Sequence, residues 1–252
     1  MRIISLDGAG PIFWREMAVF KIRLTQATFV LASMVTPLIY MLVFGLGLGR
    51  QVNLPGESDY LSFLVPGLIG MTVMVNSFTW VASSINFGRF FYRTWQIVIL
   101  SSASPLAIVA GNVAAGMARG LVAALLVGLV GVMAGWHPPA TISWPLALLL
   151  ESFVFSAFGV IIGIITKKSE EHAAYTNFLI TPMGFFCGTF FPIGNFPPWL
   201  GAVIKVLPLT HANIALREGG VSTDAMISLA ALAGFAVVLG GFACHRVATY
   251  HE

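Results

Sequence analysis

The fold is decided first by residues 60–88, which read YLSFLVPGLIGMTVMVNSFTWVASSINFG and contain no Asp, Glu, Lys or Arg. A helix needs about 20 apolar residues to cross the hydrocarbon core of a bilayer, so this run is long enough. Five further runs without these charges cover 24–49, 94–118, 120–150, 172–204 and 225–245. With 58% hydrophobic and only 9% charged residues, the chain is predicted to be an all-α, polytopic membrane protein, and a soluble enzyme is excluded.

Six transmembrane helices are predicted from these runs, at 25–47, 60–82, 106–133, 144–165, 175–191 and 225–244. They occupy more than half of the 252 residues, so 1–252 is predicted to be a single transmembrane domain. Basic residues set the orientation, because Lys and Arg are seldom moved across the membrane. With the N-terminus inside, nine basic residues are cytosolic and three are external, which predicts that both termini are cytosolic.

An amphipathic interfacial helix is predicted over 11–24, before the first span. Pro11 suits the first position of a helix, where no backbone N–H is needed. At 100° per residue, one narrow apolar stripe contains Phe13, Met17, Phe20 and Leu24. The charged residues, Glu16 among them, lie off this stripe, as expected for a helix with one face in lipid and one in the cytosol.

The connection between the second and third spans, residues 83–105, is too polar at its ends to cross a membrane and too apolar for a solvated loop. Its centre gathers aromatic residues beside two arginines, namely Arg89, Phe90, Phe91, Tyr92, Arg93 and Trp95. Aromatic residues and arginine are enriched at protein interfaces, which favours a docking helix. The residues alone are equally consistent with a helix that lies flat on the membrane.

The fifth span is interrupted by Pro182, and its second half contains Phe185, Phe186, Phe190 and Phe191. Prolines 192, 197 and 198 then break the chain on the predicted outer side. Irregular backbone at membrane depth is tolerated only where protein or water covers it, so residues 192–211 are predicted to form a re-entrant outer hairpin. The phenylalanines are predicted to form an external gate, and the alternative is that they only pack against lipid and neighbouring helices.

Polar residues inside the predicted spans include Asn76, Arg119 and Glu151. A charge at the centre of a bilayer costs roughly 2.5–3.5 kcal/mol on insertion scales, so Arg119 is expected to face the bundle or a wet cavity. The helical rise places Asn76 at a similar depth, with Glu151 nearer the outside. The three residues are therefore a possible polar cluster, serving either helix packing or a substrate path.

The whole chain resembles the permeases of ABC exporters of the type-2 membrane family. The order Pro182, Gly184, Gly188-Thr-Phe-Phe-Pro192, Phe196-Pro-Pro-Trp-Leu200, Leu207-Pro-Leu-Thr-His211 and Arg217 is similar to the C-terminal signature of that family. Leu64-Val-Pro-Gly-Leu68, Ala118-Arg-Gly120 and the aromatic segment that ends at Pro105 resemble it too. Within the family, the chain looks most like permeases for lipo-oligosaccharides, polysaccharides and drugs, those of nodulation-factor type included.

This resemblance implies a permease subunit in a bacterial cytoplasmic (inner) membrane, exporting an amphipathic substrate such as a lipid-linked glycan, lipo-oligosaccharide or hydrophobic drug. It implies a homodimer with two copies of a separate ATP-binding subunit, which would hold the ATP and Mg²⁺. The segment 88–102 would be the coupling segment, with contact residues Arg89, Arg93, Thr94, Trp95, Gln96 and Leu100. Family members often have an acid where this chain has Gln96, so a charged contact is not expected there.

The chain itself is predicted to bind no cofactor, metal or nucleic acid and to contain no catalytic set. It has no Gly-x4-Gly-Lys-Ser/Thr motif that would cradle ATP, and its five histidines show no metal-binding spacing. Two alternatives remain. A proton-coupled secondary transporter would need several intramembrane carboxylates, of which Glu151 is the main candidate. An intramembrane enzyme acting on lipids or glycans would need catalytic residues that cannot be named here.

Overall fold

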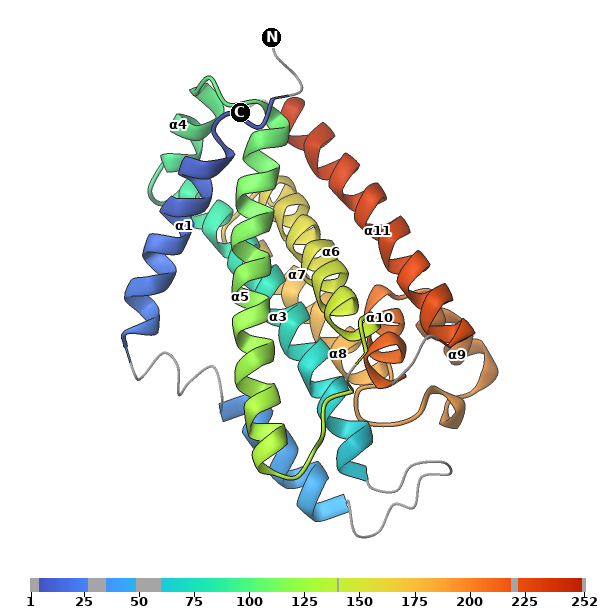
Figure 1. Cartoon of the computed structure of the whole chain (residues 1–252). Coiled ribbons are helices and arrows are strands. Elements are labelled where there is room, and N and C mark those ends of the chain that lie inside the picture. The colour runs from blue at the N-terminus through green and yellow to red at the C-terminus, as the bar shows by residue number, and fades with distance from the viewer. Residues whose placement is uncertain (1–4, 27–34, 49–59, 140, 219–221, 251–252) are drawn as a thin grey trace.

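The computed structural model describes residues 5–26, 35–48, 60–139, 141–218 and 222–250, and every regular element in these ranges is helical (Figure 1). The elements are α1 (Ala9–Leu24), a helix over Val35–Gly45 that widens to a π-helix, η1 (Met41–Leu48), α3 (Tyr60–Phe90), α4 (Thr94–Leu100), α5 (Pro105–Met133), α6 (Ser143–Ile165), α7 (Glu171–Tyr175), η2 (Thr176–Ile180), α8 (Thr181–Phe186), η3 (Ile193–Asn195), α9 (Pro198–Lys205), α10 (Pro208–Arg217) and α11 (Thr223–Ala248). The all-helical prediction is confirmed for this part of the chain.

The centre of the bundle is α3, which packs against both α5 and α6. Its residues Leu64, Val65, Ile69 and Val73 are fully enclosed. Helix α1 packs along α5, and α11 runs beside α6 with one side exposed (Figure 1). The start of α1, the end of α11 and the whole of α4 lie at one end of the bundle, called here the α4 end, and α9 lies towards the other end (Figure 1).

Small residues let α3 and α6 approach closely. Gly159 and Gly163 of α6 face α3, and a Cβ atom on Gly159 would lie only 2.8 Å from the backbone oxygen of Phe78. Such close approach of backbones is the usual role of small residues in membrane helix packing. It brings α3 and α6 close together over about one turn of α6.

The helix bounds differ from the predicted spans in informative ways. Helix α3 continues to Phe90 instead of ending at residue 82, so the predicted segment 88–102 contains the end of α3, a turn and α4. The predicted fifth span ends as a helix at Phe186, five residues before residue 191. Pro182 does not break it, because the helix widens into the π-helical turn η2 just before the proline, where the carbonyl of residue 178 would otherwise clash with the ring.

Four of the described helices are long and apolar enough to cross a membrane, namely α3, α5, α6 and α11. The pair α9 and α10 also passes this test, but the two helices are bent by 87° at the break between them. The predicted first span, 25–47, lies partly outside the described residues. Six spans and the re-entrant nature of residues 192–211 therefore stay predictions.

Candidate coupling surface and transport pathway

A tight reversal connects α3 to α4 at the α4 end. The N–H groups of Phe91 and Tyr92 both donate to the carbonyl oxygen of Phe87, at 3.0 and 2.9 Å, which closes the last turn of α3. Arg93 then adopts a left-handed backbone conformation with φ of 52°, and α4 begins at Thr94. After α4, the Ser104 hydroxyl accepts from the N–H of Ala107 at 3.1 Å and caps α5.

Trp95 holds α4 against the bundle. Its side chain is only 2% exposed and belongs to a buried apolar cluster with Ile12, Ile85 and Ile108. Gly88 of α3 permits this contact, because a Cβ there would lie 3.1 Å from Thr94 Oγ1. The sequence predicted Trp95 as a contact residue for a partner, whereas in this chain its ring is part of the core.

Arg89 is also directed into the protein. Its Nη1 donates to the backbone oxygens of Gly163, Ile164 and Thr166 at 2.7, 2.7 and 2.8 Å, and its Nε donates to the Tyr250 hydroxyl at 3.1 Å. These carbonyls belong to the C-terminal end of α6, where no intrahelical N–H is available to them. Arg89 therefore caps α6 and fastens it to the end of α3.

The outward face of α4 is apolar. Ile97 is 70% exposed and Leu100 is 86% exposed, while Phe91 and Tyr92 in the preceding turn are 62% and 74% exposed. Arg93 and Thr94 are exposed beside them, and Gln96 is half-buried. We call Phe91, Tyr92, Ile97 and Leu100 the α4 surface. Four large apolar side chains pointing away from the bundle are typical of a site that another protein covers.

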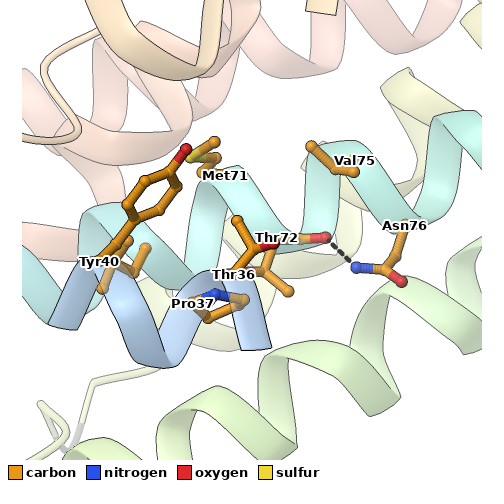
Figure 2. A pocket seen from close by; sticks show the side chains of 8 residues that line it. Thr36, Pro37, Tyr40, Met71, Thr72, Val75 and Asn76 are labelled. Atoms are coloured by element: carbon orange, nitrogen blue, oxygen red, sulfur yellow. Dashed lines mark hydrogen bonds between the residues drawn. The ribbon is translucent and has the colours of Figure 1, made fainter. Parts of the chain in front are cut away.

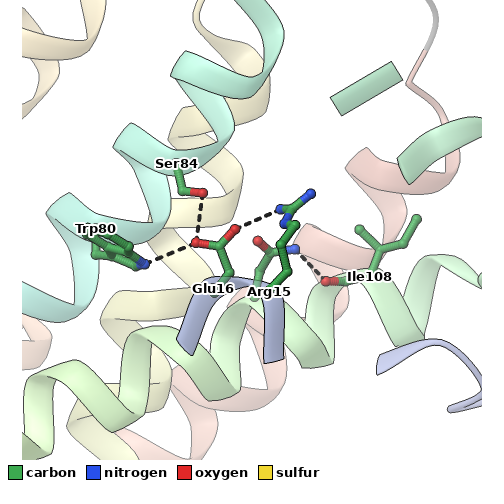
Figure 3. Close-up of polar contacts among 6 residues, drawn as sticks. Arg15, Glu16, Trp80, Ser84 and Ile108 are labelled. Carbon is green, nitrogen blue, oxygen red and sulfur yellow. Dashed lines mark hydrogen bonds and ion pairs between the residues drawn. The ribbon is translucent and has the colours of Figure 1, made fainter. Parts of the chain in front are cut away.

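Helix α1 docks on the bundle through a buried acid. Glu16 is 5% exposed and accepts from Trp80 Nε1 at 3.2 Å, from Ser84 Oγ at 2.9 Å and from Arg15 Nη2 at 2.7 Å (Figure 3). The buried face of α1 consists of Ile12, Glu16 and Phe20. The predicted stripe therefore placed Glu16 on the wrong side of the helix. A carboxylate with three donors is compatible with burial, and apolar periodicity alone cannot detect this.

Arg119 in α5 lies beside this acid. Its guanidinium carbon is 3.5 Å from the centroid of the Trp80 ring and 4.5 Å from that of Phe20, an arrangement that stabilises a cation. Arg119 and Trp80 thus join α1, α3 and α5 in the middle of the bundle. Trp80 and Glu16 were not singled out from the sequence. The four-residue spacing of Ile12, Glu16 and Phe20 is the signal that could have placed Glu16 on the buried face of α1.

Glu151 has different neighbours. Its side chain is fully buried in α6, and neither carboxyl oxygen has a hydrogen-bond partner among the described residues. A Cβ on Gly70 would lie 3.5 Å from Glu151 Oε1 and 2.6 Å from Asn213 Oδ1, so both oxygens face the same gap beside α3. Glu16 and Arg23 both act electrostatically on Arg119. The grouping of Asn76, Arg119 and Glu151 into one polar cluster stays a prediction.

Asn76 lines a pocket between α3 and the helix that begins at Val35. The pocket has a volume of about 240 Å³, and Asn76 Nδ2 donates to the Thr72 backbone oxygen at 2.9 Å in its wall (Figure 2). Its lining combines an amide and hydroxyls with apolar side chains, namely Thr36, Pro37, Tyr40, Leu68, Met71, Thr72, Val75 and Asn76. This mixture suits a ligand with both polar and apolar parts.

Aromatic rings adjoin this pocket through Tyr40. Phe190 is 1% exposed, and its ring centroid lies 4.6 Å from Phe44, 5.1 Å from Tyr40 and 5.4 Å from Phe185. The ring centroid of Phe191, whose side chain is partly exposed, lies 6.3 Å from that of Phe44. We call Tyr40, Phe44, Phe185, Phe190 and Phe191 the aromatic cluster. Phe186 is not part of it, since its ring faces Phe196 at 6.0 Å.

The bent pair α9–α10 is fastened to the chain that carries the phenylalanines. Arg217 Nη2 donates to the oxygens of Gly188 and Thr189 at 2.6 and 3.2 Å, and its Nε donates to Phe63 O at 3.0 Å. Asn213 Nδ2 donates to Cys187 O at 2.9 Å. Residues 187–189 leave carbonyls that no helix satisfies, so α10 supplies the donors that irregular backbone needs inside a bundle.

Comparison with known proteins gives a consistent result. Residues 11–220 match the model of a family described as ABC-2 type transporter. The inner membrane transport permease YadH of Escherichia coli K12 is 29% identical over 188 residues, which cover 73% of this chain and 72% of YadH. Nodulation protein J of Rhizobium meliloti is 27% identical over 232 residues, which cover 89% of this chain and 87% of that protein. The family predicted from the sequence is confirmed: the chain belongs to the ABC-2 type transporters and is a membrane permease subunit of an ABC transporter.

Proposed function

We propose that this permease works in an ATP-driven exporter and moves an amphipathic substrate outward across the cytoplasmic membrane. Two copies of the chain would form the membrane part, and two ATP-binding subunits would hold the ATP and Mg²⁺. The observation that carries the proposal is the α4 surface, an exposed apolar face whose supporting helix is fixed to the bundle by Trp95. The family membership supports the same assignment.

The α4 surface is suited to receive force from a partner. Ile97 and Leu100 face outward, while Trp95 on the same short helix is buried, so a partner that holds the outer side chains also holds the bundle. Arg89 adds a second connection, because it fastens the end of α3 to the end of α6. A displacement of α4 is therefore transmitted to two central helices instead of being absorbed by a loop.

Helix α3 provides a direct path from the α4 surface to the pocket. Asn76 and Phe90 lie on the same uninterrupted helix, fourteen residues apart, which corresponds to about 21 Å along its axis. The pocket also contains Leu68, Met71 and Thr72, which lie on the same helix farther from the α4 surface than Asn76. We propose that movement of α3 changes the spacing between this pocket wall and the helix that begins at Val35, and so exposes the substrate to alternate sides.

The pocket and the aromatic cluster are proposed as successive parts of the substrate path. The pocket walls offer apolar contacts with a few hydroxyl and amide groups, as expected for a lipo-oligosaccharide, another lipid-linked glycan or a hydrophobic drug. The aromatic cluster would be the external gate, because ring contacts without directional bonds close a dry plug and separate again when the helices move. For the gate to respond to substrate, the contacts of the aromatic cluster must differ between its closed and open states.

The experiment compares Leu100→Asp with Met133→Asp in a complex with the ATP-binding subunit of the exporter. Both side chains are almost equally exposed, at 86% and 87%, but Met133 lies at the end of α5 away from α4. We expect Leu100→Asp to abolish copurification and substrate-stimulated ATP hydrolysis in proteoliposomes, because a charge is placed in an apolar interface. Met133→Asp should retain both, and loss of both in the two variants alike would contradict the proposal.

The substrate class is tested with the same complex. Asn76→Leu removes a polar group from the pocket wall without a large change in volume. We expect it to change the concentration of lipid-glycan or drug that half-stimulates ATP hydrolysis, while the basal rate and the copurification of the ATP-binding subunit stay unchanged. An unchanged response to every substrate in the panel would place the path elsewhere.

A further inference from the structure

A second, basic pocket lies at the α4 end, where α3, α6 and α11 finish. It has a volume of about 160 Å³ and is separate from the pocket beside Asn76. Three cationic side chains line it, from Arg89, Lys167 and Arg246, and no acidic side chain is among the lining residues in the described part of the chain. Its remaining polar groups come from Thr166, Thr249 and Tyr250.

The three cations are engaged to different degrees. Arg89 donates to three carbonyls at the end of α6, whose partial negative charge offsets much of its own. Lys167 is exposed and forms no ion pair with a described residue. The Nε of Arg246 is enclosed and has no acceptor among the described residues. The nearest carboxylate that the structure shows is that of Glu171, which accepts from the Lys167 backbone N–H at 2.9 Å and does not line the pocket. Inside the pocket an anion would supply the acceptor that Arg246 Nε lacks.

An apolar strip continues from this pocket along α11. Val238 and Phe242 are 66% and 48% exposed, and they precede Arg246 by eight and four residues. Side chains four residues apart lie on the same face of a helix, so the strip leads from the cationic pocket towards the middle of the membrane-spanning helix. Charge at the helix end and an exposed apolar face above it match the two parts of a phospholipid.

We propose that this pocket binds the phosphate-bearing headgroup of an anionic phospholipid, with an acyl chain lying against Phe242 and Val238. The position of the pocket at the end of three membrane helices is where lipid headgroups are found, and basic pockets between such helices bind anionic headgroups. A soluble phosphate would leave the apolar strip uncovered. A bound lipid would join the ends of α3, α6 and α11, independently of how the partner subunit docks.

The test measures lipid retention by the full-length permease. The protein is purified in detergent, exposed to mixed micelles of phosphatidylglycerol and excess phosphatidylcholine, and its retained lipid is counted by native mass spectrometry. Arg246→Gln and Lys167→Gln each remove one pocket cation. Lys168→Gln removes the same charge from the neighbouring residue, which is exposed and does not line the pocket. Because Lys167 is on the surface, its replacement leaves the fold intact.

We expect selective retention of phosphatidylglycerol by the unaltered chain, weakened about fivefold by either pocket substitution, as one basic group near an anionic lipid contributes about that factor. Lys168→Gln should retain it fully, and Arg246→Lys should recover most of it. Equal losses in Lys167→Gln and Lys168→Gln would overturn the proposal, since they would indicate general surface charge. Equal retention of the two lipids, or displacement of phosphatidylglycerol by inorganic phosphate at the same concentration, would overturn it as well.

Discussion

Replacing Gly159 with Ala tests how closely α3 and α6 pack. The new Cβ would lie 2.8 Å from Phe78 O, 3.1 Å from Val81 Cβ and 3.3 Å from Ala82 N, whereas ordinary contact begins at 3.4 Å. Relief of the shortest contact needs a displacement of 3.4 − 2.8 = 0.6 Å. Two of the three atoms belong to the backbone of α3, so no side-chain rotation provides it.

The size of the effect follows from two opposing terms. Overpacking costs about 1–3 kcal/mol, and the rigid neighbour places this site towards the upper end. The better helix propensity of alanine returns about 0.5–1 kcal/mol. We expect a net loss of about 2 kcal/mol, which lowers the midpoint of thermal unfolding by about 4–8 °C in a chain of this length.

The assay is thermal unfolding of the purified permease, followed by tryptophan fluorescence, with Gly128→Ala as the matched control. Gly128 lies within α5, and a Cβ there would be 3.8 Å from Ile69 Cδ1, an ordinary contact. This control should be neutral or slightly stabilised. If Gly159→Ala were as stable as Gly128→Ala, α3 and α6 would not meet backbone to backbone at Gly159, and the reasoning from close packing would be refuted.

Three further predictions follow from burial. Trp95→Ala should destabilise the permease alone by about 3–5 kcal/mol because its ring is enclosed, whereas Leu100→Ala should stay within about 0.5 kcal/mol, and equal losses would contradict the assignment of Trp95 to the core. Phe190→Ala should lower the unfolding midpoint far more than Phe186→Ala, because Phe190 is 1% exposed and Phe186 is 44% exposed. The reverse order would contradict the assignment of Phe190 to the centre of the aromatic cluster. Burial lowers the pKa of His172, so as the pH falls this histidine is protonated in the unfolded chain before it is protonated in the folded one. The stability of the fold should therefore decrease as the pH drops below about 6.5. His172→Gln should weaken this pH dependence in the same thermal assay.

The predicted helices could be read from the sequence because membrane insertion imposes a strong local rule. Every residue of a long charge-free run must satisfy its backbone within the helix, and this requirement leaves a composition signal that needs no knowledge of neighbours. The predicted spans 106–133 and 144–165 agree with α5 and α6 to within one residue at each end. The Pro192–Pro198 cluster marked the irregular connection before α9 for the same local reason.

The roles of individual side chains were harder to predict, because they depend on which helices meet. Trp95 and Leu100 are both apolar residues on one short helix, and only the packing of α4 against the bundle separates the buried ring from the exposed side chain. Arg89 and Arg93 are likewise similar in the sequence. One caps the end of α6, and the other lies exposed in the turn.

The sequence by itself therefore determined the class of protein, the approximate helices and the family. The length of each hydrophobic run and the order of the motifs are properties of the linear sequence and do not depend on which helices meet. The tertiary structure alone decided which polar groups share an environment. Glu16 reaches Trp80 across 64 residues, and Arg217 reaches Phe63 across 154. Such partners are fixed by helix crossings in three dimensions, where a buried charge is stable only if distant residues supply its hydrogen bonds.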